Sequence, residues 1–208
     1  MKTVVSLFDL TGNMVRPWVE VGYTAYIVDM QHPPGQTSDE PGIVKVGADI
    51  RHGFELPGVT PAFVSAFPPC DHLAVSGARW FKGKGLRSLS LSVDLFATAA
   101  EFCDKSGAPY MIENPVSTIS TYWRKPDFIF NPFDYTGYEK TDNYTKKTCL
   151  WIGGGFAMPE KSTVTGLAAP DDRIHKCAPG PERHNIRSAT PMGFARAVFA
   201  HNATEAFV

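Results

Sequence analysis

Six short runs of apolar residues recur along the chain, each rich in β-branched or aromatic side chains. They cover residues 3–8, 24–28, 43–46, 62–67, 110–112 and 148–152. Runs of this length between turn-forming residues are typical of buried β-strands. The pattern therefore predicts six short strands.

Segments with helical spacing of apolar residues separate several of these strands. Residues 16–21 follow the first strand, and residues 89–105 follow the fourth, with Leu91, Leu95, Ala99 and Phe102 on one helical face. A last helix is predicted over residues 193–199. Strands that alternate with helices form a Rossmann-like α/β fold, in which a mostly parallel sheet carries helices on both faces. The length of 208 residues suits one domain, 1–208.

Two segments depart from this alternation. Residues 123–144 are dominated by Pro, Asp, Asn, Tyr and Lys, and residues 153–187 are punctuated by glycine and proline. Long irregular stretches are uncommon inside a compact domain unless they have a function. We expect both segments to be loop-rich insertions that line a substrate site or an interface.

Charge and cysteine usage narrow the classes of protein. Lys and Arg number 20 and Asp and Glu 21, which leaves a net charge of -1, so contact with a polyanion requires a local basic patch. The four cysteines form no CxxC pair, which argues against a disulfide framework or a zinc ribbon and favours a reducing compartment. The first apolar run is too short for a signal peptide, and no stretch has the length of a membrane span. We expect a cytoplasmic protein without a membrane partner.

Acidic residues stand at the ends of the first three predicted strands. Asp9 lies in the first strand-to-helix turn with Thr11 and Gly12, Asp29 ends the second strand, and Asp49 follows the third. Open α/β sheets bind nucleotides at the carboxyl ends of their strands, and an acid after the second strand can accept hydrogen bonds from a ribose diol. We expect Asp49 to face an adenine edge. The pattern favours a nucleotide-like cofactor.

A cysteine is presented in an unusual setting after the fourth strand. Pro68 and Pro69 precede Cys70, and two consecutive prolines fix the backbone, so the thiol is mounted rigidly at the edge of the sheet. A thiol reacts as the thiolate and needs an electropositive neighbourhood, which His72, Arg79 and the following helix could supply. We interpret Cys70 as a nucleophile.

A carboxyl group follows the fifth strand at the same edge. Glu113 and Asn114 come directly after the apolar residues 110–112. A carboxyl group in such a place tends to be desolvated, which raises its pKa toward the range useful for holding a proton. A helix-capping or ion-paired glutamate is the competing interpretation, and the proximity of the Pro-Pro-Cys turn favours the catalytic one.

These motifs, in this order, resemble those of a known enzyme family. Pro-Pro-Cys after the fourth strand and Glu-Asn after the fifth resemble the catalytic motifs of cytosine-5 DNA methyltransferases, in the short version common among bacteriophage and prophage methylases. Residues 144–151, YTKKTCLW, are similar to another run of those proteins. The C-terminal resemblance is carried by Ile174, His175, Pro181, Glu182, Arg183, Arg187, Ser188, Thr190 and Gly193. The resemblance extends over residues 3–198.

The resemblance implies a mechanism and a set of contacts. Cys70 would add to C6 of a cytosine in DNA, Glu113 would hold N3 and the exocyclic amine, and S-adenosyl-L-methionine would be the methyl donor. The implied cofactor contacts are Asp9, Thr11, Gly12, Asp29, Met30, Asp49, Ile50, Phe67 and Pro69. The implied substrate contacts are Pro68, Asn114, Arg79, Lys146 and Lys147. For a phage-encoded enzyme this implies the host cytoplasm, and an oligomer is possible.

The cluster of His175, Cys177 and His184 holds three potential metal ligands within ten positions. The family segment that it matches is not a metal site, so we expect no metal there.

Two departures from the family pattern keep other functions open. Only residues 153–182 could serve as a target-recognition region, and Asn13 and Met14 follow Gly12 where the family has a second glycine. The first alternative is the same Cys/Glu chemistry on a free pyrimidine nucleotide or a modified base. The second is a catalytically silent relic that binds nucleic acid or protein.

Overall fold

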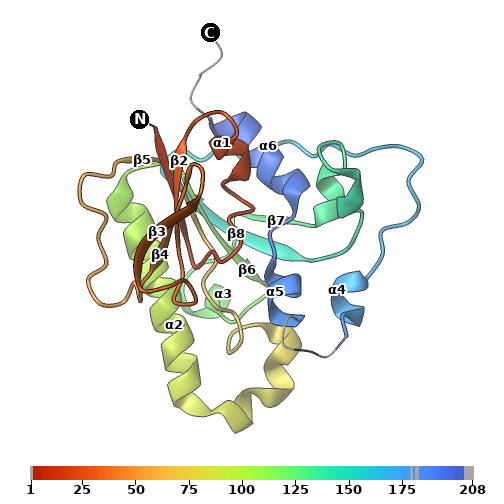
Figure 1. Cartoon of the computed structure of the whole chain (residues 1–208). Helices are drawn as coiled ribbons and strands as arrows, with labels where there is room; N and C mark the ends of the chain where they lie inside the picture. Colours follow the sequence, from red (N-terminus) through yellow and green to blue (C-terminus); the bar gives the residue numbers. More distant parts are fainter. Residues whose placement is uncertain (1, 179, 181–182, 204–208) are drawn as a thin grey trace.

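One eight-stranded sheet forms the centre of the molecule (Figure 1). The computed structural model describes residues 2–178, 180 and 183–203, so Pro181, Glu182 and the side chain of His184, which the resemblance and the metal prediction involve, lie outside the described residues. The strands are β1 (Thr3–Leu7), β2 (Thr24–Val28), β3 (Gly35–Glu40), β4 (Ile43–Gly47), β5 (Pro61–Ala66), β6 (Tyr110–Pro115), β7 (Phe128–Phe130) and β8 (Thr148–Gly153).

The strand order is β3-β4-β2-β1-β5-β6-β8-β7. The central strands β4, β2, β1, β5 and β6 are parallel to one another, β8 runs against both β6 and β7, and β3 pairs with β4 as an antiparallel edge strand. One reversed strand, β8, thus lies between β6 and β7, which run in the same direction. The Rossmann-like, mostly parallel fold predicted from the sequence is confirmed.

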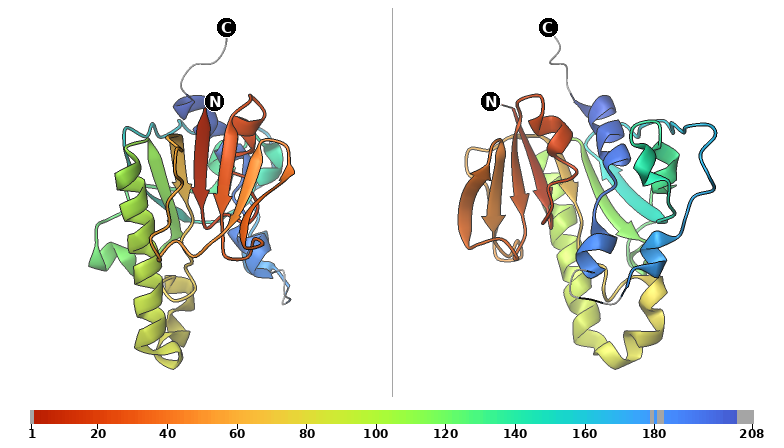
Figure 2. Two further views of the ribbon diagram at one scale, coloured as in Figure 1. Left: turned by 60° about the vertical axis from the view of Figure 1, so that its left-hand side comes forward. Right: turned by 45° about the vertical axis from the view of Figure 1, so that its right-hand side comes forward.

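Helices cover both faces of the sheet (Figure 2). The longer ones are α2 (Phe81–Ser106) and α6 (Met192–Asn202); the short ones are α1 (Arg16–Val19), α3 (Ile119–Tyr122), α4 (Arg173–Lys176) and α5 (Arg183–Ser188), with 3-10 turns η1 (Val75–Trp80), η2 (Pro132–Tyr135) and η3 (Lys140–Asp142). On one face Trp18 of α1 stacks on Phe63 of β5 at 5.1 Å and meets Phe199 of α6 edge-on at 5.2 Å. On the other face Phe96, Ala99 and Cys103 of α2 are buried against the sheet.

Five elements differ from the sequence prediction. Strand β3 has no apolar residue, and it forms because its backbone pairs with β4 at the edge of the sheet, where side chains need no core. Strand β7 is a three-residue strand inside the segment 123–144 that we predicted to be loop, and η2 and η3 lie in the same segment. Helix α2 begins at Phe81, not at residue 89, because its first turns project beyond the sheet and need no apolar face.

The projecting part of α2 is broken by a glycine. Gly85 has a φ of 78° inside the helix, which separates a short first piece from the long second one. Left-handed φ values are readily adopted only by glycine, so this residue permits the kink. The first part of α2 and the turn η1 form a V-shaped projection below the carboxyl edge of the sheet (Figure 1). We call this projection, residues 75–91, the arm. Within the part of the chain that the structure describes, no helix is long and apolar enough to cross a membrane.

Candidate active site

The two predicted catalytic residues leave the sheet at the same edge. Strand β5 ends at Ala66, which pairs in parallel with Ile112 of β6. Cys70 therefore lies in the turn beyond β5, and Glu113 lies at the corresponding level of the neighbouring strand, paired with Leu150 of β8. The carboxyl ends of parallel strands are where ligands bind in sheets of this kind.

Direct hydrogen bonds join the two motifs. Asn114, which is 1% exposed, donates from Nδ2 to the carbonyl oxygen of Pro68 at 2.8 Å. Two backbone hydrogen bonds extend the junction, from Val75 N to Val116 O at 2.9 Å and from Thr118 N to Leu73 O at 3.1 Å. Asn114 thus holds the Pro-Pro-Cys turn against β6, a positioning contact that its predicted substrate role did not include.

The electrostatics of Cys70 and Glu113 are linked. Burial, followed by the carboxyl groups of Glu113 and Asp71, raises the pKa of the Cys70 thiol to about 11, and Lys146 acts in the opposite direction. Burial also raises the pKa of Glu113, and Lys146 again opposes the shift. Glu113 and Lys146 line one cavity, and both act electrostatically on the Cys70 thiol in the turn after the adjacent strand.

Glu113 lines a small cavity that extends to the C-terminal part of the chain. The cavity measures about 10 Å³, close to the space of one water molecule. Its lining is Phe67, Glu113, Phe130, Lys146, Thr148, Thr190, Pro191 and Phe194. Lys146 donates from Nζ to the carbonyl oxygens of Ser188 at 3.2 Å and Ala189 at 3.1 Å, so its ammonium connects Glu113 with the end of α5.

The first strand-to-helix turn is built around Asp9. One carboxylate oxygen accepts from the backbone N–H of Thr11 at 2.9 Å and of Gly12 at 2.7 Å, and the other accepts from Ser6 Oγ at 2.7 Å. Phe8, with a φ of 56°, is the only non-glycine residue with positive φ among those that the structure describes. Strain of this kind concentrates at ligand sites. Both carboxylate oxygens of Asp9 accept hydrogen bonds inside the turn. Its predicted contribution to cofactor binding therefore consists of shaping the turn.

The ends of the next two parallel strands differ in how their acids are used. Asp29 accepts one backbone hydrogen bond, from Gln31 N at 2.7 Å, and Met30 beside it is 66% exposed. Asp49 is gripped by the Arg51 guanidinium, with Nε to Oδ1 at 2.9 Å, and this bond holds the pKa of Asp49 at about 2. Ile50 is buried. Asp29 keeps more of its carboxylate available to a ligand than Asp49 does.

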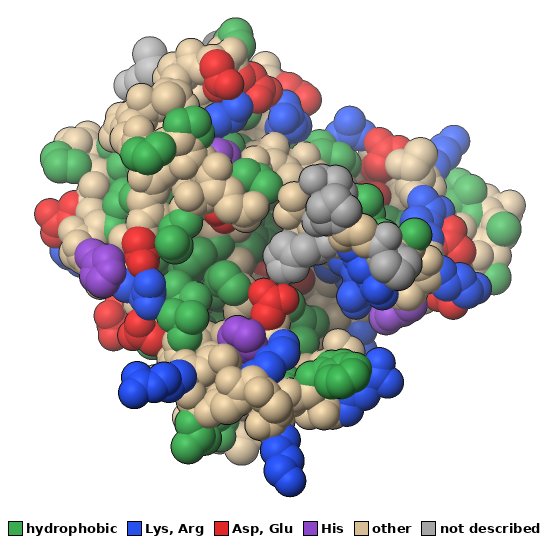
Figure 3. All heavy atoms as spheres, turned by 60° about the horizontal axis from the view of Figure 1, so that its bottom comes forward, with side chains coloured by type: hydrophobic (Ala, Val, Ile, Leu, Met, Phe, Trp, Pro, Cys, Tyr) green, Lys and Arg blue, Asp and Glu red, His purple; other side chains and the backbone are tan. Residues whose placement is uncertain are grey.

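The remaining predicted contacts lie around these turns. Phe67 lines the Glu113 cavity, and its backbone N–H donates to Leu7 O at 3.0 Å. Pro69 is half-buried in the Cys70 turn, and Lys147 is exposed. Arg79 lies on the arm, where its guanidinium packs over Trp80 at 5.1 Å. Figure 3 views the carboxyl edge of the sheet and shows Lys and Arg side chains gathered beside its hollowed middle.

Sequence analysis missed two groups that the structure brings to this edge. His32 is buried and its Nε2 lies 3.0 Å from the carbonyl oxygen of Asp9, which braces the first turn. Asn13 donates from Nδ2 to Thr190 O at 3.2 Å and so ties the same turn to the C-terminal segment. Only the resemblance around Thr190 could have indicated the second contact, and no sequence pattern indicates the first.

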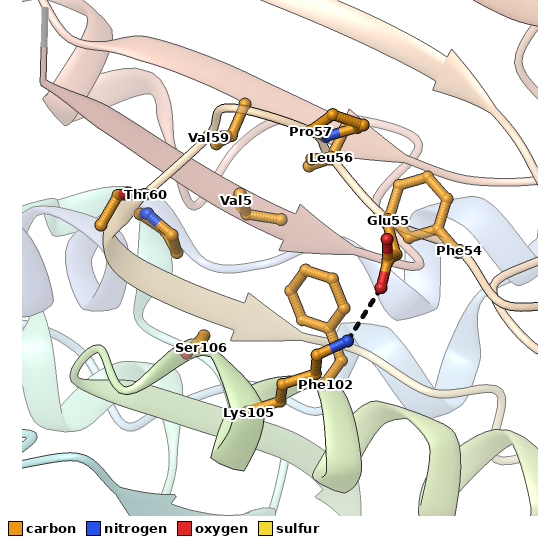
Figure 4. Close-up of a pocket in the computed structure, with 11 residues that line it drawn as sticks. Val5, Phe54, Glu55, Leu56, Pro57, Val59, Thr60, Phe102, Lys105 and Ser106 are labelled. Atoms are coloured by element: carbon orange, nitrogen blue, oxygen red, sulfur yellow. Dashed lines mark hydrogen bonds and ion pairs between the residues drawn. The ribbon is translucent and has the colours of Figure 1, made fainter.

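A larger cavity, about 260 Å³, lies away from this site (Figure 4). It opens between Val5, the loop before β5 and the end of α2, with an ion pair from Lys105 to Glu55 of 2.9 Å beside it. None of the residues predicted to bind cofactor or substrate lines it. Its size alone does not make it the reaction site.

Comparison with known proteins gives little further support. No family model matches the chain, and no curated protein matches it. Among solved structures it is similar to a DNA modification methyltransferase encoded within a prophage of E. coli, a description that is provisional for that protein itself, with 12% identity and a TM-score of 0.46. The match covers 74% of this chain and 46% of that one, so the chain spans about half the length of that protein.

Proposed function

We propose that this chain is an S-adenosylmethionine-dependent DNA methyltransferase that modifies C5 of cytosine through a covalent bond to Cys70. The observation that carries the proposal is that Cys70 and Glu113 lie at the ends of the adjacent parallel strands β5 and β6, with Lys146, which precedes the antiparallel β8, lining the same cavity as Glu113. Perturbed titratable groups of this kind cluster at functional sites.

The residues at the first turns fit the cofactor. The strained turn from Phe8 to Gly12 brings backbone close to the edge of the sheet, and Asp29 has carboxylate capacity left for a ribose diol. Met30 offers an exposed apolar side chain beside it. When bound, S-adenosylmethionine supplies an electrophilic methyl group to a nucleophilic carbon.

Glu113 is suited to hold a proton for the base. Because burial raises its pKa, the carboxyl group stays protonated to a higher pH than an exposed glutamate and can donate to N3 of cytosine. A proton at N3 makes C6 more electrophilic and takes up the negative charge that thiolate addition brings to the ring. Lys146 is placed to compensate any charge left on the pair.

Cys70 is suited to add to C6 only after losing its proton. In the free protein the thiol is protonated near neutral pH, since its pKa is about 11. Formation of the S–C6 bond places electron density at C5, which takes the methyl group. Loss of the C5 proton to water and return of the N3 proton to Glu113 then allow the S–C6 bond to break, which restores the aromatic ring and releases Cys70 as the thiolate. Covalent catalysis thereby divides one difficult step into two.

The arm supports DNA over a free nucleotide as the substrate. Its four cations, Arg79, Lys82, Lys84 and Arg87, are all exposed, and no Asp or Glu occurs between residues 72 and 93. Trp80 is 61% exposed between them. Cations interleaved with an exposed aromatic ring suit the phosphates and bases of a nucleic acid. Because the net charge of the whole chain is -1, contact with DNA requires a local basic patch, and the arm offers one.

The test is incubation with methyl-labelled S-adenosylmethionine and, separately, duplex DNA, single-stranded DNA, RNA and cytidine nucleotides, followed by mass analysis of the digested product. We expect 5-methylcytosine in DNA. Label in the nucleotide sample alone would replace DNA by a free pyrimidine as substrate. No transfer to any of the four, by protein shown to be folded, would refute the proposed activity.

A further inference from the structure

The space beside Glu113 is too small for a pyrimidine ring. The cavity of about 10 Å³ accommodates a water molecule, so part of its lining must move when a base enters. Phe194 is a fixed part, because it stacks on Phe130 at 4.0 Å and is 1% exposed. The next residue toward the N-terminus, Gly193, is anchored by its N–H to the buried carboxylate of Asp142 at 2.7 Å.

The part that precedes α6 is held by side chains from elsewhere in the chain and by a backbone bond from Ala189 N to Asn185 O of 3.0 Å. We call residues 188–190 the strap. Its carbonyl oxygens accept hydrogen bonds from two side chains: Lys146 reaches Ser188 and Ala189, and Asn13 reaches Thr190. Thr190 lines the cavity with Glu113. The strap is therefore a wall of the cavity that is bonded to one residue from each of the two proposed sites, Asn13 from the cofactor turn and Lys146 from the catalytic pair.

Asn13 belongs to the turn that we assign to the cofactor. It follows Gly12, whose N–H is fixed by Asp9, and its own N–H donates to Thr11 Oγ1 at 3.3 Å. A molecule that orders this turn also orders the side chain that holds Thr190. Lys146, at the other end of the strap, acts on Cys70 and Glu113. The strap thus joins the two halves of the site through hydrogen bonds of 3.1 to 3.2 Å.

We propose that Asn13 is a positioning residue that sets the wall of the base pocket through its bond to Thr190, so that cofactor and base bind with mutual dependence through the strap. This inference rests on the proposed function. Coupling between two sites is reciprocal, so a base that shifts the strap changes cofactor affinity by the same factor as the cofactor changes affinity for the base. We expect a factor of about 5 to 10, at the lower end of usual couplings.

Two measurements on the full chain test the proposal, with S-adenosylhomocysteine as an unreactive form of the cofactor. Calorimetry gives its dissociation constant with and without a saturating cytosine-containing duplex. Hydrogen exchange gives the protection of a peptide that covers the strap. Asn13→Ala removes the bond to Thr190, and Asn13→Asp keeps the shape but replaces the donor with an acceptor. Asn143→Ala is the matched control, because Asn143 Nδ2 also donates to a distant backbone carbonyl, Ala168 O, at 2.8 Å.

In the wild type and in Asn143→Ala we expect S-adenosylhomocysteine to slow exchange in the strap and the duplex to change its affinity by the coupling factor. Both Asn13 variants, with unfolding midpoints like that of the wild type, should lose both effects. Unchanged strap exchange in the wild type on ligand binding, or full coupling in the Asn13 variants, overturns the inference and leaves the proposed function standing. If the wild type gives no calorimetric binding at all, the cofactor assignment fails and the coupling fails with it.

Discussion

Two acidic residues at the same edge of the sheet, the buried Asp9 and the half-buried Glu113, differ in their hydrogen bonds. Asp9, at the end of β1, accepts hydrogen bonds from Ser6, Thr11 and Gly12. Among the residues that the structure describes, no hydrogen bond or ion pair holds the carboxyl group of Glu113 on β6, and burial raises its pKa. A carboxyl group with a raised pKa and no bonded partner is typical of functional sites. The comparison separates Asp9, which shapes the first turn, from Glu113, which we propose takes part in the reaction.

The strongest test of the proposed reaction removes its nucleophile. Cys70→Ala deletes the only atom that can form the S–C6 bond, and we expect methyl transfer to fall by at least about 10⁴-fold. Binding of S-adenosylhomocysteine, measured by calorimetry, should change little because Cys70 is not among the predicted cofactor contacts. Cys177→Ala serves as the control, since Cys177 is also a free, half-buried cysteine. Turnover retained in Cys70→Ala would refute its role.

The second test concerns the proton held by Glu113. We expect Glu113→Gln to lower the rate by about 10² to 10⁴-fold, the usual range for a general acid. The control is Glu101→Gln, an exposed position on α2. Wild-type rates in Glu113→Gln would remove the carboxyl group from the mechanism.

The pH dependence of the rate gives a sharper form of this test. In the productive form Cys70 is a thiolate and Glu113 is protonated. This form carries the same number of protons as the form with a Cys70 thiol and a Glu113 carboxylate. The productive fraction of the protein is therefore constant between the pKa of Glu113 and that of Cys70. In the wild type kcat/KM should rise through the raised pKa of Glu113 and then stay level toward the Cys70 pKa of about 11. In Glu113→Gln only the thiolate fraction remains, so the rate should rise about tenfold per pH unit. A level profile in the variant would contradict this account.

The sequence predicted the placement of Cys70 and Glu113 at one edge of the sheet better than it predicted the structure of the turn around Asp9. Cys70 and Glu113 follow apolar strands in adjacent positions, and parallel pairing brings such positions together without any further information. The satisfaction of Asp9 depends on Ser6 and on the N–H groups of a turn whose φ at Phe8 is positive, and no local propensity predicts that conformation. The strand β3 was missed for a similar reason, because it is made by pairing at an edge and not by burial of its polar side chains.

The third test compares Asp9 and Asp29, one through the free energy of unfolding and the other through the affinity for the cofactor. Asp9→Ala leaves the N–H groups of Thr11 and Gly12 without their acceptor inside the protein, which should lower the free energy of unfolding by about 1 to 3 kcal/mol. Asp29→Ala should leave stability within about 0.5 kcal/mol. It should instead weaken S-adenosylmethionine binding by about tenfold if the ribose is held there. Urea unfolding and calorimetry measure the two effects. An unchanged dissociation constant in Asp29→Ala would place the ribose elsewhere.

The smallest expected effect lies outside both turns, on the arm. Lys82 is exposed, so Lys82→Ala removes one of the cations offered to phosphate without disturbing either acid. We expect a loss of duplex affinity of about two- to fivefold and a slope of log K against log salt that is shallower by about 0.9, the value for one phosphate contact. Lys45→Ala is the control, because it removes the same charge from β4, where Lys45 pairs with Asp39 at 3.0 Å. Equal slopes for Lys82→Ala and the wild type would show that the arm does not face the phosphates. An equal change of slope in Lys82→Ala and Lys45→Ala would mean that DNA affinity follows the net charge of the protein and not the arm.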